Sequence, residues 1–382
     1  MTHLVVTAWR MLVHNRPRLL LSCLSIAFAV VIMFMQMGFF NGLNDSQANL
    51  ARILDADLVM SHRDKDNLKS TEEFSRKRWR QALAVPGVES GSYLYASASY
   101  WWNPQDGSRN RLLVLGIDPD NAGLRVPGGA ASLQPLKQPG TIFYDRRSRK
   151  ELGSVDVGTE ATLGQARVRV AGLFDLGANF SYEGHVIAGT ETFFRIFSQR
   201  DPQRLADRIS LGLLRLQPGA DAGKVSQQLL DALPGDFTVM TRAQLEAREK
   251  AYTTRATPVG IIFGLGLMVA LVIGIIICHQ LLFNEIQDHL RQFATLKAIG
   301  YQARHLYLLV TSEALLLSVL GFLPGLAATF ALYRAIEQLS EIVMHLSPGR
   351  ILFILCLTLL MGAASAALAL KQVIRLDPAD LF

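Results

Sequence analysis

Hydrophobic residues along this chain gather into four long runs, at residues 19–40, 256–284, 314–333 and 351–370. None of the four runs contains Asp, Glu, Lys or Arg. A helix needs about 20 apolar residues to cross the hydrocarbon core of a bilayer. Helices satisfy every backbone polar group in lipid, so the runs predict four transmembrane helices. The alternative, core helices of a soluble protein, would require all four apolar runs to be buried within one chain.

The first run could also be a cleaved signal peptide, because basic residues precede it and Ala27-Phe28-Ala29 resembles a cleavage site. That triplet lies in the middle of the run, however, and the run exceeds the usual apolar region of about 7–15 residues. We therefore interpret it as an uncleaved span that begins near Pro17, where the missing N–H does no harm.

The basic residues next to the runs predict the orientation of the chain. Short loops rich in Lys and Arg stay in the cytoplasm. The basic flanking positions are Arg10, Arg16, Arg18, Arg291, Lys297, Arg304, Lys371 and Arg375. In the loop near 335–350 the arginines are offset by Glu337 and Glu341. Both termini and the loop after the second span are therefore predicted to be cytoplasmic, with the long segment after the first span outside.

The expected fold class is an α-helical membrane protein with four transmembrane helices and a large α+β periplasmic domain inserted between helices one and two. The predicted segments are a cytoplasmic N-terminal segment (1–18), the first span (19–41), the periplasmic domain of two lobes (42–255), the second span (256–284), a cytoplasmic loop (285–304), the third span (305–334), a short periplasmic loop (335–350), the fourth span (351–371) and a cytoplasmic tail (372–382).

Within the long segment, two stretches show the same order of strand, helix and strand. The first runs from a strand at 56–61 through a helix in 70–88, capped by Ser70 or Thr71, to paired strands at 91–102 and 109–117. The second stretch is 208–241, and both helices end near a Pro-Gly pair. The repetition predicts a pseudo-symmetric α+β lobe. The Gly-rich middle part, with short alternating runs, predicts a second, mostly β lobe.

Enzymatic chemistry is weakly represented in the sequence. All three cysteines lie in the apolar runs, the histidines are scattered, and no CxxC or HExxH spacing occurs. The nearest approach to a phosphate loop, GADAGKVS at 219–226, has a shortened glycine spacing and Val225 in place of Ser or Thr. We expect no cofactor on this chain, so any ATP-driven work must be done by a partner. The net charge of +6 largely reflects topology, and no nucleic-acid motif appears.

The stretch 288–300, between the second and third spans, is charged yet suited to a helix. At 100° per residue, Leu290, Phe293 and Leu296 share an apolar side with Lys297, while Arg291 shares the polar side with Ile299. Gly300 is a natural end for the helix. The pattern is compatible with a helix lying in the membrane interface and with a short helix that docks into another protein.

The stretch 290–321 resembles the signature of FtsX/MacB-type permeases of ABC transporters. Leu296, Lys297, Ala298, Ile299, Gly300 and Glu313 match that signature, and Gln292 stands where the family usually has Glu. The segment 8–30 resembles the family's amphipathic entry helix, here placed at 1–18, together with its first span, and the segment 374–382 resembles the family's usual ending. The closest resemblance is to the DevC branch, the permease of DevBCA-type exporters, through the stretches 28–39, 56–61, 74–83 and 293–301.

The resemblance implies a homodimeric permease in the bacterial inner membrane that contacts membrane lipid. It also implies a separate ABC ATPase, a periplasmic membrane-fusion adaptor and an outer-membrane channel. The chain would then export a lipid-like or amphipathic cargo and would not itself be an enzyme. The residues expected to couple to the ATPase are Leu290, Arg291, Phe293, Leu296, Lys297, Ile299 and Gly300. Glu313 is the candidate polar residue within the spans, ahead of Gln36, His279 and Gln280.

Other functions share this architecture. One is a Lol-type permease that extracts lipid or lipoprotein, which would need a chaperone rather than a channel. Another is a non-transporting FtsX-like regulator that activates a cell-wall hydrolase. A membrane-embedded enzyme is a further class, which ATP-independent turnover of a lipid would support.

Overall fold

The computed structural model describes residues 16–68, 70–126, 132–179, 181–233, 235–256, 258–288, 303–340, 344 and 346–374. These residues form two compact units. The membrane unit contains the first helix up to Asn41 and the helices after Val259, and the extramembrane unit contains Gly42–Pro258.

Four helices of the described chain are long and apolar enough to cross a membrane, which confirms the predicted membrane-protein class. They are α2 (Arg16–Ile53), α8 (Val259–Asp288), α10 (Ala303–Ser340) and α11 (Pro348–Ile374). All four extend beyond the apolar runs that revealed them, because helical hydrogen bonding continues into polar residues once the helix has formed. The cytoplasmic helix predicted at 1–18 falls largely outside the described residues.

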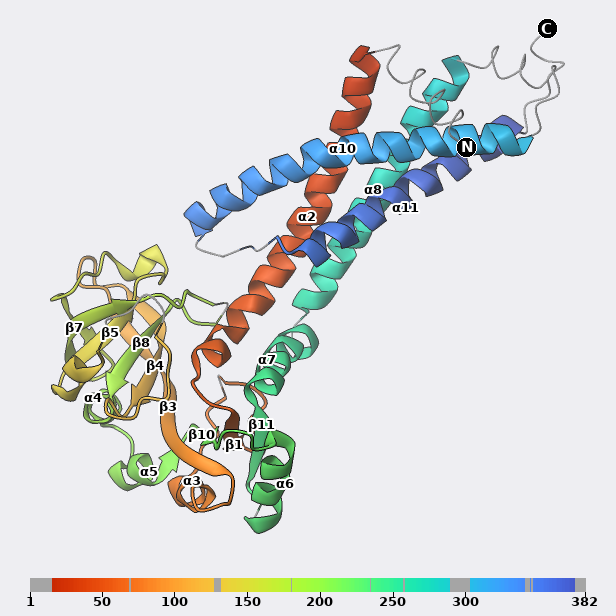
Figure 1. Cartoon of the computed structure of the whole chain (residues 1–382). Helices are drawn as coiled ribbons and strands as arrows, with labels where there is room; N and C mark the ends of the chain where they lie inside the picture. The colour runs from red at the N-terminus through yellow and green to blue at the C-terminus, as the bar shows by residue number, and fades with distance from the viewer. Residues whose placement is uncertain are drawn as a thin grey trace, which may run out of the picture. The chain divides into compact units, whose positions relative to one another are not determined.

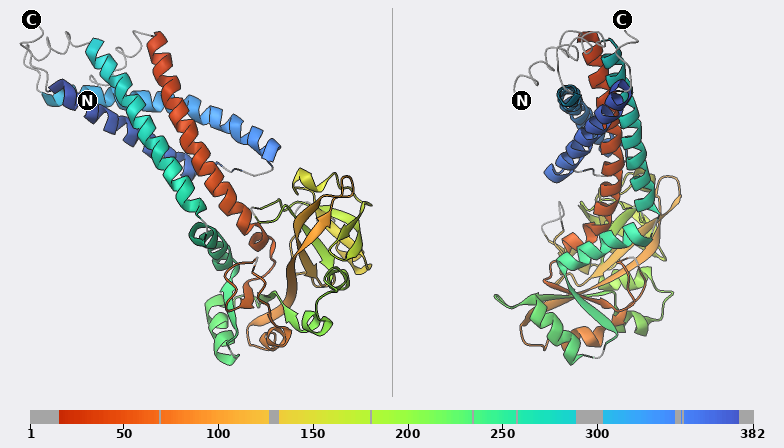
Figure 2. Two further views of the ribbon diagram at one scale, coloured as in Figure 1. Left: turned by 180° about the vertical axis from the view of Figure 1, so that it is seen from behind. Right: turned by 90° about the vertical axis from the view of Figure 1, so that its right-hand side faces the viewer.

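Close helix contacts hold the membrane unit together. α8 and α11 lie side by side (Figures 1 and 2). α10 crosses α2 where a Cβ atom at Gly321 would lie 2.6 Å from Cβ of Ile26. The hydroxyl of Tyr333 on α10 donates to the backbone carbonyl of Phe34 on α2. Lipid offers no hydrophobic drive for helix association, so contacts through small residues and interhelical hydrogen bonds carry the packing.

The contact at Gly321 predicts a position-dependent effect of adding one methyl group. Gly321→Ala should destabilise the membrane unit by roughly 1–3 kcal/mol, because the backbone and Ile26 must move apart. Gly264→Ala on α8 is the matched control, since no other helix among the described residues has an atom within 4 Å of a Cβ placed there. Thermal unfolding of the full chain in detergent measures both variants. Equal melting temperatures for the two would contradict the close crossing of α2 and α10.

The extramembrane unit contains an antiparallel four-stranded sheet in the order β11-β1-β10-β3. Two strand–helix–strand segments build it: β1 (Leu58–His62), α3 (Arg76–Ala82) and β3 (Val88–Trp102), then β10 (Leu211–Leu216), α6 (Ala222–Ala232) and β11 (Phe237–Thr241). This is the split βαβ arrangement. The predicted pseudo-symmetric α+β lobe is therefore confirmed.

Alternating residues of β1 explain how both faces of this sheet are covered. Leu58 and Met60 join the cluster that contains side chains of α3 and α6. Val59, on the opposite face, joins a second cluster with Leu50 of α2 and Leu245 of α7 (Arg242–Ala256). The helix end that follows the first span and the helix that precedes the second thus pack in the same core cluster against one sheet.

The predicted β lobe is a closed barrel. Its strands follow the order β3-β4-β8-β5-β7-β6, and β6 pairs back onto β3 at Trp101 and Trp102. The other strands are β4 (Arg109–Ile117), β5 (Thr141–Asp145), β6 (Glu160–Leu163), β7 (Ala166–Phe174) and β8 (Gly184–Gly189). The fifteen-residue strand β3 belongs to both lobes, pairing with β10 through its first half and with β4 through its second. The barrel strands gather in one part of the extramembrane unit (Figure 1).

The short elements complete the extramembrane unit. They are β2 (Phe74–Ser75), η1 (Gln134–Lys137), η2 (Lys150–Leu152), α4 (Thr190–Ile196), α5 (Pro202–Asp207) and β9 (Arg208–Ile209). The prediction that a helix starts at Ser70 or Thr71 was wrong. The helix, α3, starts at Arg76, because strand β2 occupies the two residues before it. Phe74 and Ser75 pair with β9, and the hydroxyl of Ser75 accepts the N–H of Lys77 and caps the helix.

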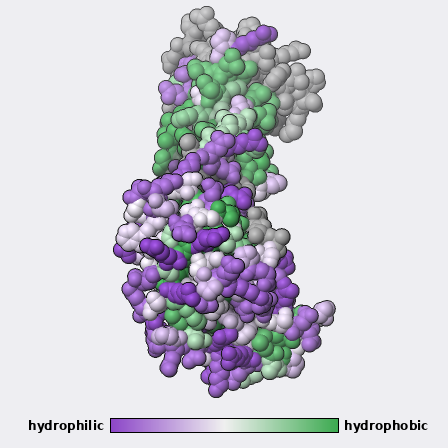
Figure 3. Space-filling model, turned by 90° about the vertical axis from the view of Figure 1, so that its left-hand side faces the viewer, coloured by the Kyte–Doolittle hydropathy of each residue, from purple (hydrophilic) through white to green (hydrophobic). Residues whose placement is uncertain are grey.

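The surfaces of the two units differ in polarity. Figure 3 shows hydrophobic side chains over the membrane helices and mostly hydrophilic ones over the extramembrane unit. Exposed apolar residues such as Leu24, Leu265 and Leu323 lie on three different helices of the membrane unit. Surfaces of this kind suit lipid around the helices and water around the domain.

Candidate functional site

The residues expected to couple to an ATPase, Leu290 to Gly300, lie outside the described residues. α8 ends at Asp288 and α10 begins at Ala303, so the structure bounds the segment on both sides. Their role stays a prediction.

Glu313 is buried in the membrane unit, with 2% of its surface exposed. It lies on α10 next to Ala314, whose carbonyl would be 3.1 Å from a Cβ atom at Gly362 of α11. With so little of its surface exposed, Glu313 is enclosed by the other residues of this unit, as a polar group inside a span should be. Its part in transport stays a prediction.

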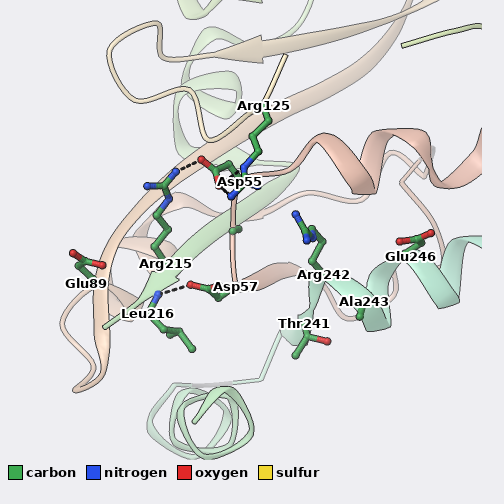
Figure 4. Close-up of a pocket in the computed structure, with 11 residues that line it drawn as sticks. Asp55, Asp57, Glu89, Arg125, Arg215, Leu216, Thr241, Arg242, Ala243 and Glu246 are labelled. Carbon is green, nitrogen blue, oxygen red and sulfur yellow. Dashed lines mark hydrogen bonds and ion pairs between the residues drawn. The ribbon is translucent and has the colours of Figure 1, made fainter. Parts of the chain in front are cut away.

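A polar cavity of about 530 Å³ opens in the extramembrane unit. Its wall comes from the segment between α2 and β1, from β3, β10 and the loop after β4, and from the start of α7 (Figure 4). The charged lining residues are Asp55, Asp57, Glu89, Arg125, Arg215, Arg242 and Glu246. The charges of both signs suit ion-pair contacts with a polar surface rather than burial of an apolar ligand.

Asp55 fixes the geometry on one side of this cavity. Its carboxylate contacts Arg125 at 2.8 Å and also Arg215 (Figure 4). The nearby carboxylate of Asp57 accepts the backbone N–H of Leu216 at 2.9 Å. Asp55 therefore joins the end of α2, the loop after β4 and strand β10 at one point.

The start of α7 on the other side is set by a reciprocal cap. The N–H of Gln244 donates to the hydroxyl of Thr241 at 3.2 Å, and the N–H of Thr241 donates to the side-chain oxygen of Gln244 at 2.8 Å. This capping box satisfies two backbone donors that a helix leaves open. The sequence analysis did not predict this cavity. The one local feature that could have indicated it is the pair of acidic residues Asp55 and Asp57.

A second buried polar cluster lies at the barrel. Asp145 is fully buried and accepts the N–H groups of Arg147, Leu176 and Gly177 at 3.1, 3.0 and 2.9 Å. Its second oxygen lies 3.2 Å from Nδ1 of the buried His185. These bonds hold the loop between β7 and β8 against the end of β5.

Lys65 is a buried charge in the loop after β1. Its ammonium group donates to the carbonyls of Ser70 and Glu72. Burial lowers the pKa of Lys65 to about 8, and the neighbouring carboxylates of Glu72 and Glu249 oppose the shift. These contacts hold the loop after β1 in place.

Within the described chain, no group of three or more His, Cys, Asp or Glu residues is placed to bind a metal.

Comparison with solved structures finds several similar domains of low identity. The periplasmic region of MacB from Actinobacillus actinomycetemcomitans is 12% identical, with 51% of this chain and 92% of that chain covered and a TM-score of 0.38. The extracellular domain of the noncanonic ABC-type transporter YknZ from Gram-positive bacteria is 12% identical, with coverage of 49% and 99% and a TM-score of 0.34. A domain of a putative permease protein from Porphyromonas gingivalis is 14% identical, with coverage of 49% and 90% and a TM-score of 0.32.

No curated protein sequence matches the chain. The family model described as FtsX-like permease C-terminal matches residues 260–378. The match contains the second, third and fourth candidate spans and the segment predicted to couple to an ATPase. The expected resemblance to FtsX-type permeases is thereby confirmed for this part of the chain. The protein is a multi-pass membrane protein whose residues 260–378 match the FtsX-like permease C-terminal family model.

Proposed function

We propose that this chain is the permease subunit of an ABC transporter that exports a lipid-like or amphipathic cargo across the cell envelope. The FtsX-like permease match over residues 260–378 carries the proposal. Four helices able to span a membrane and a folded domain between the first two support it. The energy comes from a separate ATPase, on which ATP and Mg²⁺ bind.

In this proposal the large domain is periplasmic and the permease works in the bacterial inner membrane as a homodimer of the DevC type. A membrane-fusion adaptor and an outer-membrane channel continue the path outward. The segment 290–300 contacts the ATPase, and displacement of the spans is passed to the extramembrane unit. The chain supplies the element with two conformations, and its partner supplies the chemistry.

Purification of the full chain tests the assignment. Tagged protein extracted from native membranes in mild detergent should bring down, in stoichiometric amount, a second protein that carries a phosphate loop. ATP hydrolysis should follow that second protein, and the chain alone should have none. Magnesium-dependent hydrolysis by the chain itself, freed of contaminating ATPases, would refute the permease assignment. Recovery of a cell-wall hydrolase in place of an adaptor would contradict the export role.

The orientation gives a second test. In a variant whose three cysteines are replaced by alanine, a cysteine at Ser108, in the turn between β3 and β4, should react with a membrane-impermeant maleimide in intact cells with a permeable outer membrane. A cysteine at Gln302 should react only after lysis, because the positive flanks hold that loop in the cytoplasm. The reverse pattern would overturn the proposed topology.

A further inference from the structure

The extramembrane unit is joined to the membrane helices through two helical segments. α2 contains the first candidate span, and its last part, from Gly42 to Ile53, belongs to the extramembrane unit. α7 ends just before α8, which contains the second candidate span. Each segment carries an acidic and a basic residue in its extramembrane part. Asp45 and Arg52 are two helical turns apart on α2, and Glu246 and Lys250 are one turn apart on α7.

These four side chains, here called the α2–α7 network, alternate in charge and bridge the two helices. Lys250 contacts Asp45 at 3.3 Å and Glu246 at 3.0 Å. Arg52 contacts the same two carboxylates, Asp45 at 3.4 Å and Glu246 at 2.9 Å. Each cation thus contacts one carboxylate on its own helix and one on the other helix.

The network is better placed than an ordinary surface ion pair. Its side chains are only partly exposed, from 17% for Asp45 to 39% for Arg52. Burial raises the pKa of Glu246, but hydrogen bonds from Lys250 and Arg52 outweigh it and leave that pKa below its ordinary value. Exposed single pairs contribute little, whereas several charges in fixed mutual geometry do contribute.

A neighbouring face of α7 is fixed independently, because residues one position apart lie about 100° apart around a helix. Leu245 is fully buried in the core beneath the sheet, and the carboxylate of the buried Glu249 accepts the N–H of Leu68 at 2.9 Å. α7 is therefore attached to the folded domain through one face and to α2 through the neighbouring face. A slip of α7 along α2 by one turn, about 5.4 Å, would break every interhelical contact of the network.

We propose that the α2–α7 network locks the extramembrane ends of α2 and α7 together, so that they move as one body during the transport cycle. This inference rests on the proposed function. Without the lock, a displacement of one span would be absorbed by sliding between the two helices. With it, the displacement reaches the sheet that both helices cover.

Hydrogen exchange on the full chain in detergent tests the lock without any partner. Lys250→Glu places a third carboxylate beside Asp45 and Glu246, and Asp45→Lys places a third cation beside Arg52 and Lys250. Each change should raise amide exchange in α7 roughly tenfold, as expected when a small network is replaced by repulsion. The fourfold inversion Asp45→Lys/Arg52→Glu/Glu246→Lys/Lys250→Glu restores opposite charges at all four contacts and should return exchange to within about threefold of the original.

A matched control is the pair Glu191–Arg195 on α4, whose side chains are 60% and 56% exposed. Arg195→Glu breaks an ion pair in the same domain and should leave exchange in α7 unchanged. Unaltered exchange in both single reversals, or no recovery in the fourfold inversion, would overturn the lock.

The motion itself is tested in the complex with the ATPase by spin labels at Ser46 on α2 and Ala247 on α7, with native cysteines replaced. The distance between the labels should be the same and narrowly distributed with and without a nonhydrolysable ATP analogue. It should broaden in Lys250→Glu while the ATPase stays bound and active. A distance that changes with nucleotide in the otherwise unaltered chain would overturn the inference. Failure to recover an ATPase would instead count against the proposed function. The hydrogen-exchange experiment would still test the contact between α2 and α7, because it needs no partner.

Discussion

Replacing both Phe293 and Leu296 by alanine should abolish recovery of the ATPase with this chain and should abolish export. Both residues lie on the apolar side of the helix predicted between α8 and α10. A buried aromatic or aliphatic anchor at an interface typically costs about 2 kcal/mol or more when cut to alanine, roughly thirtyfold in binding for each residue. Loss of both anchors would raise the dissociation constant of a tight complex above the protein concentrations used in purification, so the ATPase would no longer be recovered.

The same experiment separates docking from membrane anchoring. If the helix only lay in the membrane interface, the substitutions would weaken the membrane contact of a chain already held by four spans, and ATPase recovery would be normal. Arg291→Ala, on the polar side of the helix, should have a smaller effect than the double substitution. Expression and dimerisation should be unchanged in all variants. Normal ATPase recovery with Phe293→Ala/Leu296→Ala would defeat the docking interpretation.

Asp145→Ala should produce the largest loss of stability in the extramembrane unit. The substitution leaves the buried N–H groups of Leu176 and Gly177 without their acceptor and removes the carboxylate beside His185. A buried donor left unsatisfied costs about 1–3 kcal/mol, so the total is about 4 kcal/mol. For a domain of this size, that loss lowers the melting temperature by about 10 °C.

The matched control for Asp145 is Asp120, whose ion pair with Lys137 is exposed. Asp120→Ala should change the free energy of unfolding by no more than about 0.5 kcal/mol. Limited proteolysis of the full chain should show early cleavage in the loop between β7 and β8 for Asp145→Ala alone. A melting temperature equal to that of the Asp120 variant would mean that the loop is held by other contacts.

Parts of the fold follow directly from local patterns. Residues 208–241 show a strand, a capped helix and a second strand, and the structure contains β10, α6 and β11 there. Asp221 caps α6 by accepting the N–H groups of Gly223 and Lys224. The pairing of β3 with β4 was predictable for the same reason, since a short turn joins two alternating strands.

Other parts were not predictable, because the deciding partner is distant in the sequence. The helix expected from Ser70 begins only at Arg76, since Phe74 pairs with Ile209 of β9. Closure of the barrel depends on β6 meeting the end of β3, with Trp101 opposite Leu163. In the cavity, Asp55 contacts arginines 70 and 160 positions away. Nothing in the local sequence of these residues specifies such partners.

The sequence by itself determined the membrane class, the number of candidate spans and the α+β character of the domain between the first two. These properties depend on the length of apolar runs and on local periodicity, which act within a few turns of the chain. Only the tertiary structure decided that α2 and α7 cover one sheet and meet through four alternating charges. Ion pairs between helices depend on which faces the core turns toward each other, and that choice is made by the packing of residues such as Leu50, Val59 and Leu245.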